Sequence, residues 1–258
     1  MKYLDTHSHI YEKKFDKDRE AVFARMKELQ VGTIVVGTCL ETSKKAVESV
    51  EGVVLGATIG VHPTDTNETF DPKVYTKLLS DKVVGIGECG FDYFRTPRDE
   101  VYTRQREVFE AQVRFAAEND LPLMLHIRPS EGGVDAHKDA LEVIDLYQKI
   151  FGATVRGNVH FFTSTKEIAR EYVARGFTIA FPGVITFVPE LHEVVRDVPL
   201  DMMLAETDAP YAAPVPYRGK RNEPTFVLDV IRAIAAIRGE DFVEVATQLR
   251  ENARHMFV

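Results

Sequence analysis

Two imidazoles near the start of the chain have the spacing of a metal-binding pair. His7 and His9 follow the segment Met1–Asp5, which has the pattern of a short strand entering a core. Side chains two residues apart on an extended backbone point to the same side. Two neutral imidazoles on one side make half of a transition-metal site. A solvated histidine pair near the terminus would have the same local sequence, so the other ligands must identify the site.

Further candidate ligands come at the ends of segments that have the composition of strands. They are Glu88, His126, His160 and Asp208, and His62 lies at another such end. Five of the eight histidines in the chain lie at such ends, and the others (His137, His192 and His255) lie in expected helices or loops. A single histidine at a strand end is more often a hydrogen-bonded structural residue than a ligand. Scattered structural histidines would not sort in this way, so the pattern favours a metal centre.

The elements that must position these residues alternate between β-rich and amphipathic segments. The expected strands are Met1–Asp5, Thr33–Thr38, Val53–Val61, Val83–Glu88, Pro122–His126, Val155–His160, Phe177–Phe181 and Asp201–Glu206. The expected helices are Asp16–Gln30, Glu41–Val50, Asp71–Ser80, Asp99–Asn119, Asp139–Phe151, Lys166–Arg175, Glu190–Arg196 and Thr225–Arg238. The capping-box pattern Asp241–Glu244 opens a last helix.

Eight alternating units predict an α/β fold, a (β/α)8 TIM-like barrel that forms a single domain over residues 1–258. A doubly wound open sheet is the alternative. It is disfavoured because eight units fit into about 250 residues and no GxGxxG follows the first strand. In a barrel, the C-terminal ends of all strands meet at one rim, where the chemistry of this fold takes place. We therefore expect the candidate ligands to converge there.

The composition excludes several other classes of protein. With 45% apolar and 28% charged residues, the chain has the balance of a globular protein with a large core. It has no apolar run of membrane-spanning length and no signal-peptide core, and its two cysteines lack a CxxC pattern. We expect a cytoplasmic protein without membrane contacts. The net charge of −8 argues against broad electrostatic binding to nucleic acid but leaves room for a small pocket that holds one phosphate.

Imidazole and carboxylate ligands without thiolate suit divalent ions such as Mg²⁺, Mn²⁺ or Zn²⁺. The six candidates are His7, His9, Glu88, His126, His160 and Asp208. Six ligands are too many for one tetrahedral ion and fit two ions about 3.5–4 Å apart that share a carboxylate. Glu88 is the expected bridge, because its strand lies between the first and fifth strands. Water activated by the ions would be the nucleophile, and Asp208 is expected to hold it and accept its proton.

A phosphodiester substrate would need cationic and hydrogen-bonding groups at the same rim. Arg128, two residues after His126, is expected to clamp a phosphate, with a structural ion pair as the alternative. His62 is a candidate donor to a phosphate or leaving-group oxygen, or else holds a loop. Arg218 follows the eighth strand, where barrels often bind phosphate. Three aromatic residues are candidates either for stacking on bases or for packing: Tyr93, Phe94 and Tyr211.

Ordered motifs extend along the whole chain. They are Asp5-Thr6-His7-Ser8-His9, Gly60-Val61-His62-Pro63, Gly87–Tyr93, Arg104–Phe109, Leu121–Arg128, Glu206–Tyr211 and Pro216–Asn222. In this order they resemble the TatD family of metal-dependent deoxyribonucleases, within the amidohydrolase superfamily. The resemblance implies a TIM-like barrel that hydrolyses phosphodiester bonds in DNA and trims DNA from the 3′ end in the cytoplasm. It implies one ion bound by His7, His9, Glu88 and Asp208 and a second bound by Glu88, His126 and His160.

The chain departs from the family pattern at three places. Thr64 stands where the family usually has a second histidine, and Phe161–Ser164 replaces a Cys-Phe-Ser-Gly motif. Residues 129–137 are expected to form a longer, more glycine-rich loop. None of these positions is a proposed ligand, so we expect them to affect substrate preference. Asp5 is expected either to hold the ligand residues in position without binding a metal itself, or to pair inside the barrel.

Two other functions would use the same residues. A lactonase, deacylase or amidohydrolase would place a carbonyl group in the same centre, but many of those relatives have a carboxylated lysine where Glu88 stands. Arg128 also suits a phosphate better than a neutral carbonyl. A non-catalytic, metal-stabilised module is disfavoured, because ligands at an open rim make a poor closed structural site. We therefore predict a monomeric, metal-dependent phosphodiesterase that acts on DNA or on a nucleotide phosphodiester.

Overall fold

Eight parallel strands pair in chain order in the computed structural model, which describes residues 1–257. Their bounds are β1 Tyr3–Ser8, β2 Val31–Val36, β3 Val54–Ile59, β4 Val83–Asp92, β5 Leu123–Arg128, β6 Gly157–Val159, β7 Phe177–Phe181 and β8 Met203–Ala205. The sheet curls until its edges meet, where Ser8 bridges to Ala209 and the amide of His9 donates to the carbonyl of Ala209 at 2.7 Å. The expected TIM-like barrel is confirmed.

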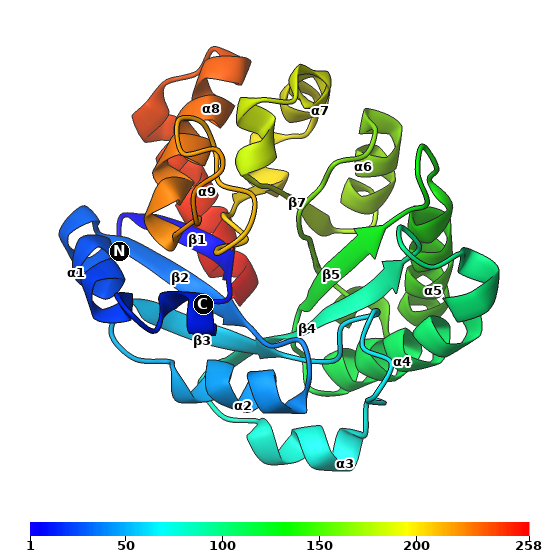
Figure 1. Ribbon diagram of the computed structural model, residues 1–258. Coiled ribbons are helices and arrows are strands. Elements are labelled where there is room, and N and C mark those ends of the chain that lie inside the picture. Colours follow the sequence, from blue (N-terminus) through cyan, green and yellow to red (C-terminus); the bar gives the residue numbers. More distant parts are fainter. Residues whose placement is uncertain (258) are drawn as a thin grey trace.

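The helices surround the strands (Figure 1). The α-helices are α1 Arg19–Leu29, α2 Leu40–Glu48, α3 Pro72–Tyr75, α4 Arg98–Glu118, α5 Asp135–Phe151, α6 Lys166–Val173, α7 His192–Asp197, α8 Val227–Arg238 and α9 Phe242–Phe257. Short 3-10 helices lie between them: Lys13–Phe15, Thr76–Leu78, Gly152–Thr154, Gly183–Thr186, Pro189–Leu191, Leu200–Met202 and Pro224–Phe226. Among residues 1–257, no helix has the length and apolarity that crossing a membrane requires.

Two apolar clusters pack against the strands. The larger one lies mainly between the strands and the outer helices and includes Val35 of β2. The smaller one contains residues at every second position of the strands, such as Ile34 and Val36 of β2, together with Ala253 and Phe257 of α9. Since side chains alternate between the two faces of a strand, the smaller cluster occupies the barrel interior. Phe257 also approaches the start of β4, so α9 covers the N-terminal end of the barrel and the polar residues are left at the other end.

Three strands and one helix extend beyond their expected bounds near the site. β1 continues to Ser8 and β5 to Arg128, so His7 and His126 lie within strands. β4 runs four residues past Glu88, because it stays paired with β5 as far as the partners Asp92 and Arg128. α5 begins at Asp135, so the last part of the expected 129–137 loop is helical. β2 begins and ends two residues before its expected bounds, and β3, β6 and β8 are shorter than expected. Parts of the expected helices Asp71–Ser80 and Thr225–Arg238 are 3-10 helices.

Candidate metal centre

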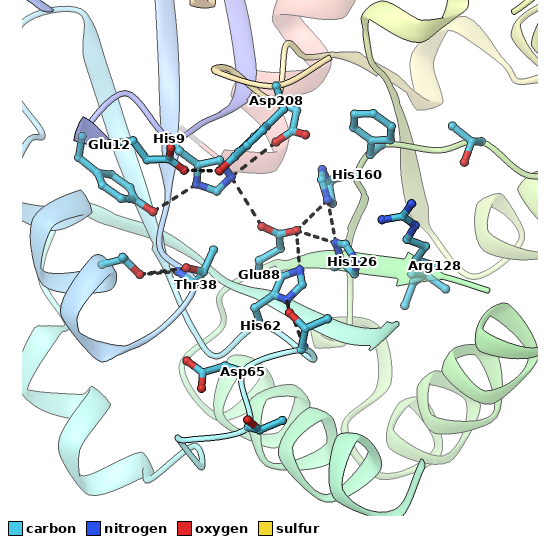
Figure 2. A pocket seen from close by; sticks show the side chains of 18 of the residues that line it. His9, Glu12, Thr38, His62, Asp65, Glu88, His126, Arg128, His160 and Asp208 are labelled. Atoms are coloured by element: carbon cyan, nitrogen blue, oxygen red, sulfur yellow. Dashed lines mark hydrogen bonds and ion pairs between the residues drawn. The ribbon is translucent and has the colours of Figure 1, made fainter. Parts of the chain in front are cut away.

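Glu88 lies at the middle of the C-terminal rim, and its two carboxylate oxygens face different histidines (Figure 2). Oε1 is 2.7 Å from Nδ1 of His126 and 2.9 Å from Nε2 of His160. Oε2 is 3.5 Å from Nε2 of His7 and 3.8 Å from Nε2 of His9. The Glu88 side chain is 5% exposed, so this carboxylate is enclosed almost entirely by imidazoles.

The first group has the dimensions of a metal site. The Nε2 atoms of His7 and His9 are 3.2 Å apart and, with Glu88 Oε2, form a triangle with sides of 3.2, 3.5 and 3.8 Å. Ligand atoms around a tetrahedral ion with bonds of about 2.1 Å are separated by about 3.4 Å. Asp208 Oδ1 approaches the two histidines at 3.7 and 3.5 Å. Its amide donates to the carbonyl of His7 at 2.9 Å, which fixes Asp208 beside β1.

The second group forms a tighter triangle. Nδ1 of His126 and Nε2 of His160 are 3.4 Å apart, and both lie within hydrogen-bonding distance of Glu88 Oε1. Burial acts to raise the pKa of Glu88, but the imidazoles, first His160 and then His62, hold that pKa well below its usual range. Burial acts to lower the pKa of His160, but Glu88 and Glu206 raise it well above its usual range. The carboxylate thus favours a positive charge at this position, supplied by a proton or by a cation.

Unpartnered atoms lie behind the same residues. Among residues 1–257, four buried side-chain atoms have no hydrogen-bond partner, and three of them are His7 Nδ1, His160 Nδ1 and Glu206 Oε2. The rings of His7 and His160 are stacked with centroids 4.0 Å apart. Glu206 Oε1 lies 3.4 Å from His160 Nδ1, without the alignment of a hydrogen bond, and accepts from the amide of Phe161. Buried polar atoms are rarely left without a hydrogen-bond partner, so packing alone does not account for the side chains at the base of this centre. The residues present fit divalent ions.

Other groups of possible ligands overlap with this centre or have a simpler explanation. Two overlapping triads are His62, Glu88 and His126, and His7, His160 and Glu206. A separate triad is Cys39, Asp65 and Glu68. In that triad Glu68 accepts from the amide of Leu40 and from the hydroxyl of Tyr75, so it caps α2. We assign no metal to the separate triad.

Asp5 ties β1 to the segment that carries Asp208. Its buried carboxylate accepts from the amide of Thr207 at 2.8 Å, from the Thr207 hydroxyl at 2.9 Å and from the Thr33 hydroxyl at 3.1 Å. Nδ2 of Asn222 in turn donates to the carbonyl of Thr207 at 2.8 Å. Burial raises the pKa of Asp5 well above its usual range. This network fixes the backbone on both sides of the barrel seam.

Two carboxylates of the site have no role in the sequence-based interpretation. Asp92 Oδ2 lies 3.0 Å from Nε2 of His126, and Glu206 lies behind His160. Asp92 is four residues after Glu88, a spacing that places both side chains on one side of a strand. The expected strand ends at Glu88 and so does not include Asp92, whereas β4 in the structure extends to Asp92. Glu206 is two residues before the expected ligand Asp208, and the direction of its side chain depends on barrel closure.

The expected substrate contacts are distributed unevenly. A cavity of about 740 Å³ opens above Glu88, and His62, Arg128 and Tyr211 are among its lining residues. Nε2 of His62 is 3.5 Å from Glu88 Oε1. The guanidinium of Arg128 lies 3.8 Å from the ring centroid of the exposed Phe94.

Two other candidates have contacts away from the cavity. Arg218 is not among the residues that line the cavity, and its guanidinium lies 3.5 Å from the ring centroid of Phe187. Tyr93 is buried, and its hydroxyl donates to Asp139 at 2.7 Å, as expected of a packing residue. Stacking on bases is thus left to Phe94 and Tyr211, which are both exposed.

Both the sequence and the fold are similar to those of known proteins. The family model described as TatD related DNase matches residues 4–258. A Bacillus subtilis relative, the uncharacterized metal-dependent hydrolase YabD, is 38% identical over 98% of both chains. A relative from Pectobacterium carotovorum, named 3′-5′ ssDNA/RNA exonuclease TatD, is 33% identical over 98% of both chains. The crystal structure of YjjV, a TatD homologue from Escherichia coli, has a TM-score of 0.87 at 26% identity and covers 99% of this chain and 98% of its own.

Proposed function

The chain belongs to the TatD-related DNase family of metal-dependent hydrolases, and on that basis we propose that it hydrolyses phosphodiester bonds in DNA and removes nucleotides from the 3′ end. The observation that carries this proposal is the position of Glu88 between two groups of possible ligands, with one oxygen directed at each. A shared carboxylate suits a pair of divalent ions, the arrangement that stabilises both the attacking and the leaving oxygen in displacement at phosphorus.

The proposed ligands form two sets that share Glu88. His7, His9, Glu88 and Asp208 would hold one ion, and Glu88, His126 and His160 would hold the other. When bound, the ions supply Lewis acidity, which makes water a nucleophile at neutral pH and offsets the charge of the phosphoryl group. Nitrogen and oxygen ligands of this kind suit Mg²⁺, Mn²⁺ or Zn²⁺.

Asp208 is the proposed proton acceptor. Its side chain lines the cavity, and its backbone amide is held by the carbonyl of His7. A carboxylate fixed at the mouth of the centre can orient an attacking water and accept its proton. Glu88 is enclosed by imidazoles, so its proposed part in catalysis is to keep the two halves of the centre together.

His62 is proposed as a hydrogen-bond donor to the substrate and not as a further ligand. The amide of Thr64 donates to His62 Nδ1 at 3.2 Å, so Nδ1 carries a lone pair and the ring proton is on Nε2. Nε2 faces the centre beside Glu88. Burial lowers the pKa of His62, and His126 lowers it further, which favours the neutral ring. A phosphoryl oxygen in the centre would accept this N–H.

Arg128 is proposed to bind a second part of the sugar–phosphate backbone. It lines the same cavity, and its contact with Phe94 restrains the guanidinium. A restrained guanidinium can offer two parallel hydrogen bonds to a phosphate. The exposed ring of Phe94, together with Tyr211, would let single-stranded bases stack at the rim.

The test uses the full chain with Mn²⁺ or Mg²⁺ and a single-stranded oligonucleotide labelled at its 5′ end. We expect a ladder of products that shortens by one nucleotide at a time, and a block when the 3′-terminal linkage is a phosphorothioate. Glu88→Gln and Asp208→Ala should each lower the rate by orders of magnitude and retain the native circular dichroism spectrum. An unfolded spectrum for both variants would mean that these residues are structural.

The alternatives give different outcomes in the same assays. Hydrolysis of a lactone or an acyl-amide without release of nucleotides would identify a carbonyl substrate for the centre. Metal binding with no effect of Glu88→Gln on any hydrolytic rate would indicate a non-catalytic module. Either result would refute the proposed nuclease activity.

A further inference from the structure

We propose that Asp92 is a positioning residue of the metal centre, which fixes the ring of His126 so that Nδ1 is the nitrogen available to the second ion. This inference rests on the proposed two-ion centre and adds a residue outside its ligand set. Asp92 is the last residue of β4 and is 6% exposed.

Carboxylates of one strand contact both nitrogens of the His126 ring. Nδ1 lies 2.7 Å from Glu88 Oε1 and Nε2 lies 3.0 Å from Asp92 Oδ2. Between these carboxylates, Gly90 pairs with His126 in the sheet register. A Cβ on Gly90 would come within 2.3 Å of the His126 carbonyl oxygen, so the two strands approach each other closely at this point. The ring therefore spans the distance from Glu88 to Asp92 along β4.

Further hydrogen bonds hold Asp92 in place. Its amide donates to Oε1 of Gln105, and Nε2 of Gln105 donates back to its carbonyl, both at 3.0 Å. Its Oδ1 accepts from the amide of Phe94 at 3.0 Å. Helix α4 thus fixes the backbone and the following turn fixes the carboxylate. An acceptor held at three points can select one orientation of the imidazole.

The orientation decides which nitrogen is free. An ionised carboxylate only accepts hydrogen bonds, so Nε2 of His126 carries a proton, and Nδ1 is left to face the centre. Carboxylates that hold histidine ligands in this way typically contribute about 10–100-fold to metal affinity. The histidines of the first group lack such a partner: His9 Nδ1 faces the carbonyl of Val36 at 2.9 Å, and His7 Nδ1 is unpartnered within residues 1–257. Asp92 should therefore affect only one of the two ions.

The probe is Zn²⁺ alone, titrated into the metal-free full chain in competition with a chromophoric chelator. For the unchanged chain we expect two Zn²⁺ per molecule. Asp92→Ala should weaken one site about 10–100-fold and leave the other unchanged. Asp92→Asn, which keeps the shape and the acceptor for Phe94, would turn its NH₂ group toward Nε2 and favour a proton on Nδ1, so it should weaken the same site at least as much as Asp92→Ala. Equal losses at both sites, or no loss in either variant, would overturn the role of Asp92.

A second background separates positioning from a general effect of charge. His126→Ala removes the only ligand that Asp92 contacts, so adding Asp92→Asn to it should leave the affinity of the remaining site unchanged. A further loss in the double variant would overturn the inference, because Asp92 would then act by another route. Asp139→Asn is the matched control: Asp139 is also a buried carboxylate, but its partners are Tyr93 and Arg98, and its loss should leave both Zn²⁺ affinities intact.

The outcomes also distinguish this inference from the function on which it depends. An unchanged chain that binds no Zn²⁺ would overturn the two-ion centre and the role of Asp92 with it. Two Zn²⁺ bound with unchanged affinities in both Asp92 variants would overturn the role of Asp92 alone.

Discussion

Replacement of Asp5 tests how the seam of the barrel holds the metal centre. The buried carboxylate of Asp5 accepts from the amide and the hydroxyl of Thr207 and from the hydroxyl of Thr33, at 2.8, 2.9 and 3.1 Å. Thr207 precedes Asp208, whose amide donates to the carbonyl of His7. Asp5 therefore fixes the backbone that brings Asp208 to the two N-terminal histidines.

Asp5→Ala should lower the free energy of unfolding by about 2–4 kcal/mol. Four donors lose their acceptor, the most distant of them the amide of His7 at 3.4 Å. The two hydroxyls can turn elsewhere: Thr207 Oγ1 also lies 3.5 Å from the carbonyl of His7, and Thr33 Oγ1 lies 3.3 Å from that of Ile34. The amide of Thr207 cannot turn, and an unpaired buried amide costs about 1–3 kcal/mol. The weaker replacement hydrogen bonds of the hydroxyls account for the remaining loss.

Asp5→Asn should cost less than about 1 kcal/mol. The side-chain oxygen of asparagine can still accept from the amide of Thr207. Its NH₂ group would face the hydroxyls of Thr207 and Thr33, and hydroxyls accept as well as donate. Burial has already raised the pKa of Asp5 well above its usual range, so the loss of the charge removes little stabilisation.

The assay is urea-induced unfolding of the metal-free chain at pH 7, followed by circular dichroism. Thr207→Ser, which keeps the hydroxyl, serves as a control for Thr207→Val, which removes it and should also destabilise the fold. Asn and Ala variants of equal stability would refute the reasoning, because the charge of Asp5 and not its hydrogen bonds would then be decisive. An Ala variant as stable as the unchanged chain would refute it as well.

Three further predictions concern protons, ions and substrate. Burial lowers the pKa of His137 to about 4, so the folded chain binds fewer protons than the unfolded chain at intermediate pH. The stability that this residue contributes is therefore complete above about pH 6.5 and falls as the pH decreases toward 4. Urea unfolding at pH 7 and pH 5 should show a loss of about 2 kcal/mol from this residue, absent in His137→Gln; equal losses in both chains would contradict it. Each ion present at about 100 times its Kd should add about 2.7 kcal/mol, so EDTA should lower the unfolding temperature, and an unchanged temperature would count against metal binding. His62→Ala and Arg128→Ala should raise KM for the oligonucleotide with two Zn²⁺ still bound, whereas loss of zinc in either would make that residue a ligand.

The sequence predicts the fold and the rim well because both follow from short-range patterns. Alternation of strands and helices gives the barrel, and imidazoles or carboxylates at strand ends give its rim. The role of Asp92 depends on the length of β4, which is set by pairing with β5 and not by the sequence of β4, where Gly87 and Gly90 suggest an earlier end. The direction of Glu206 and the distance of Arg218 from the cavity depend on how the loops after β8 fold back. Contacts of that kind have no local signature.

The contacts that close the barrel also assemble the metal centre. Within residues 1–257, β1 and β8 form no ladder, and β1 joins the segment after β8 through a single bridge between Ser8 and Ala209. The seam also contains the hydrogen bonds of Asp5 with Thr207, together with those from the amide of Asp208 to His7, from the amide of His9 to Ala209 and from the hydroxyl of Thr6 to Ala205. Most of these contacts lie on the segment Thr207–Ala209, so they also bring Asp208 to His7. An ion bound by both residues would cross this seam, so the free energy of ion binding would also stabilise the closed barrel.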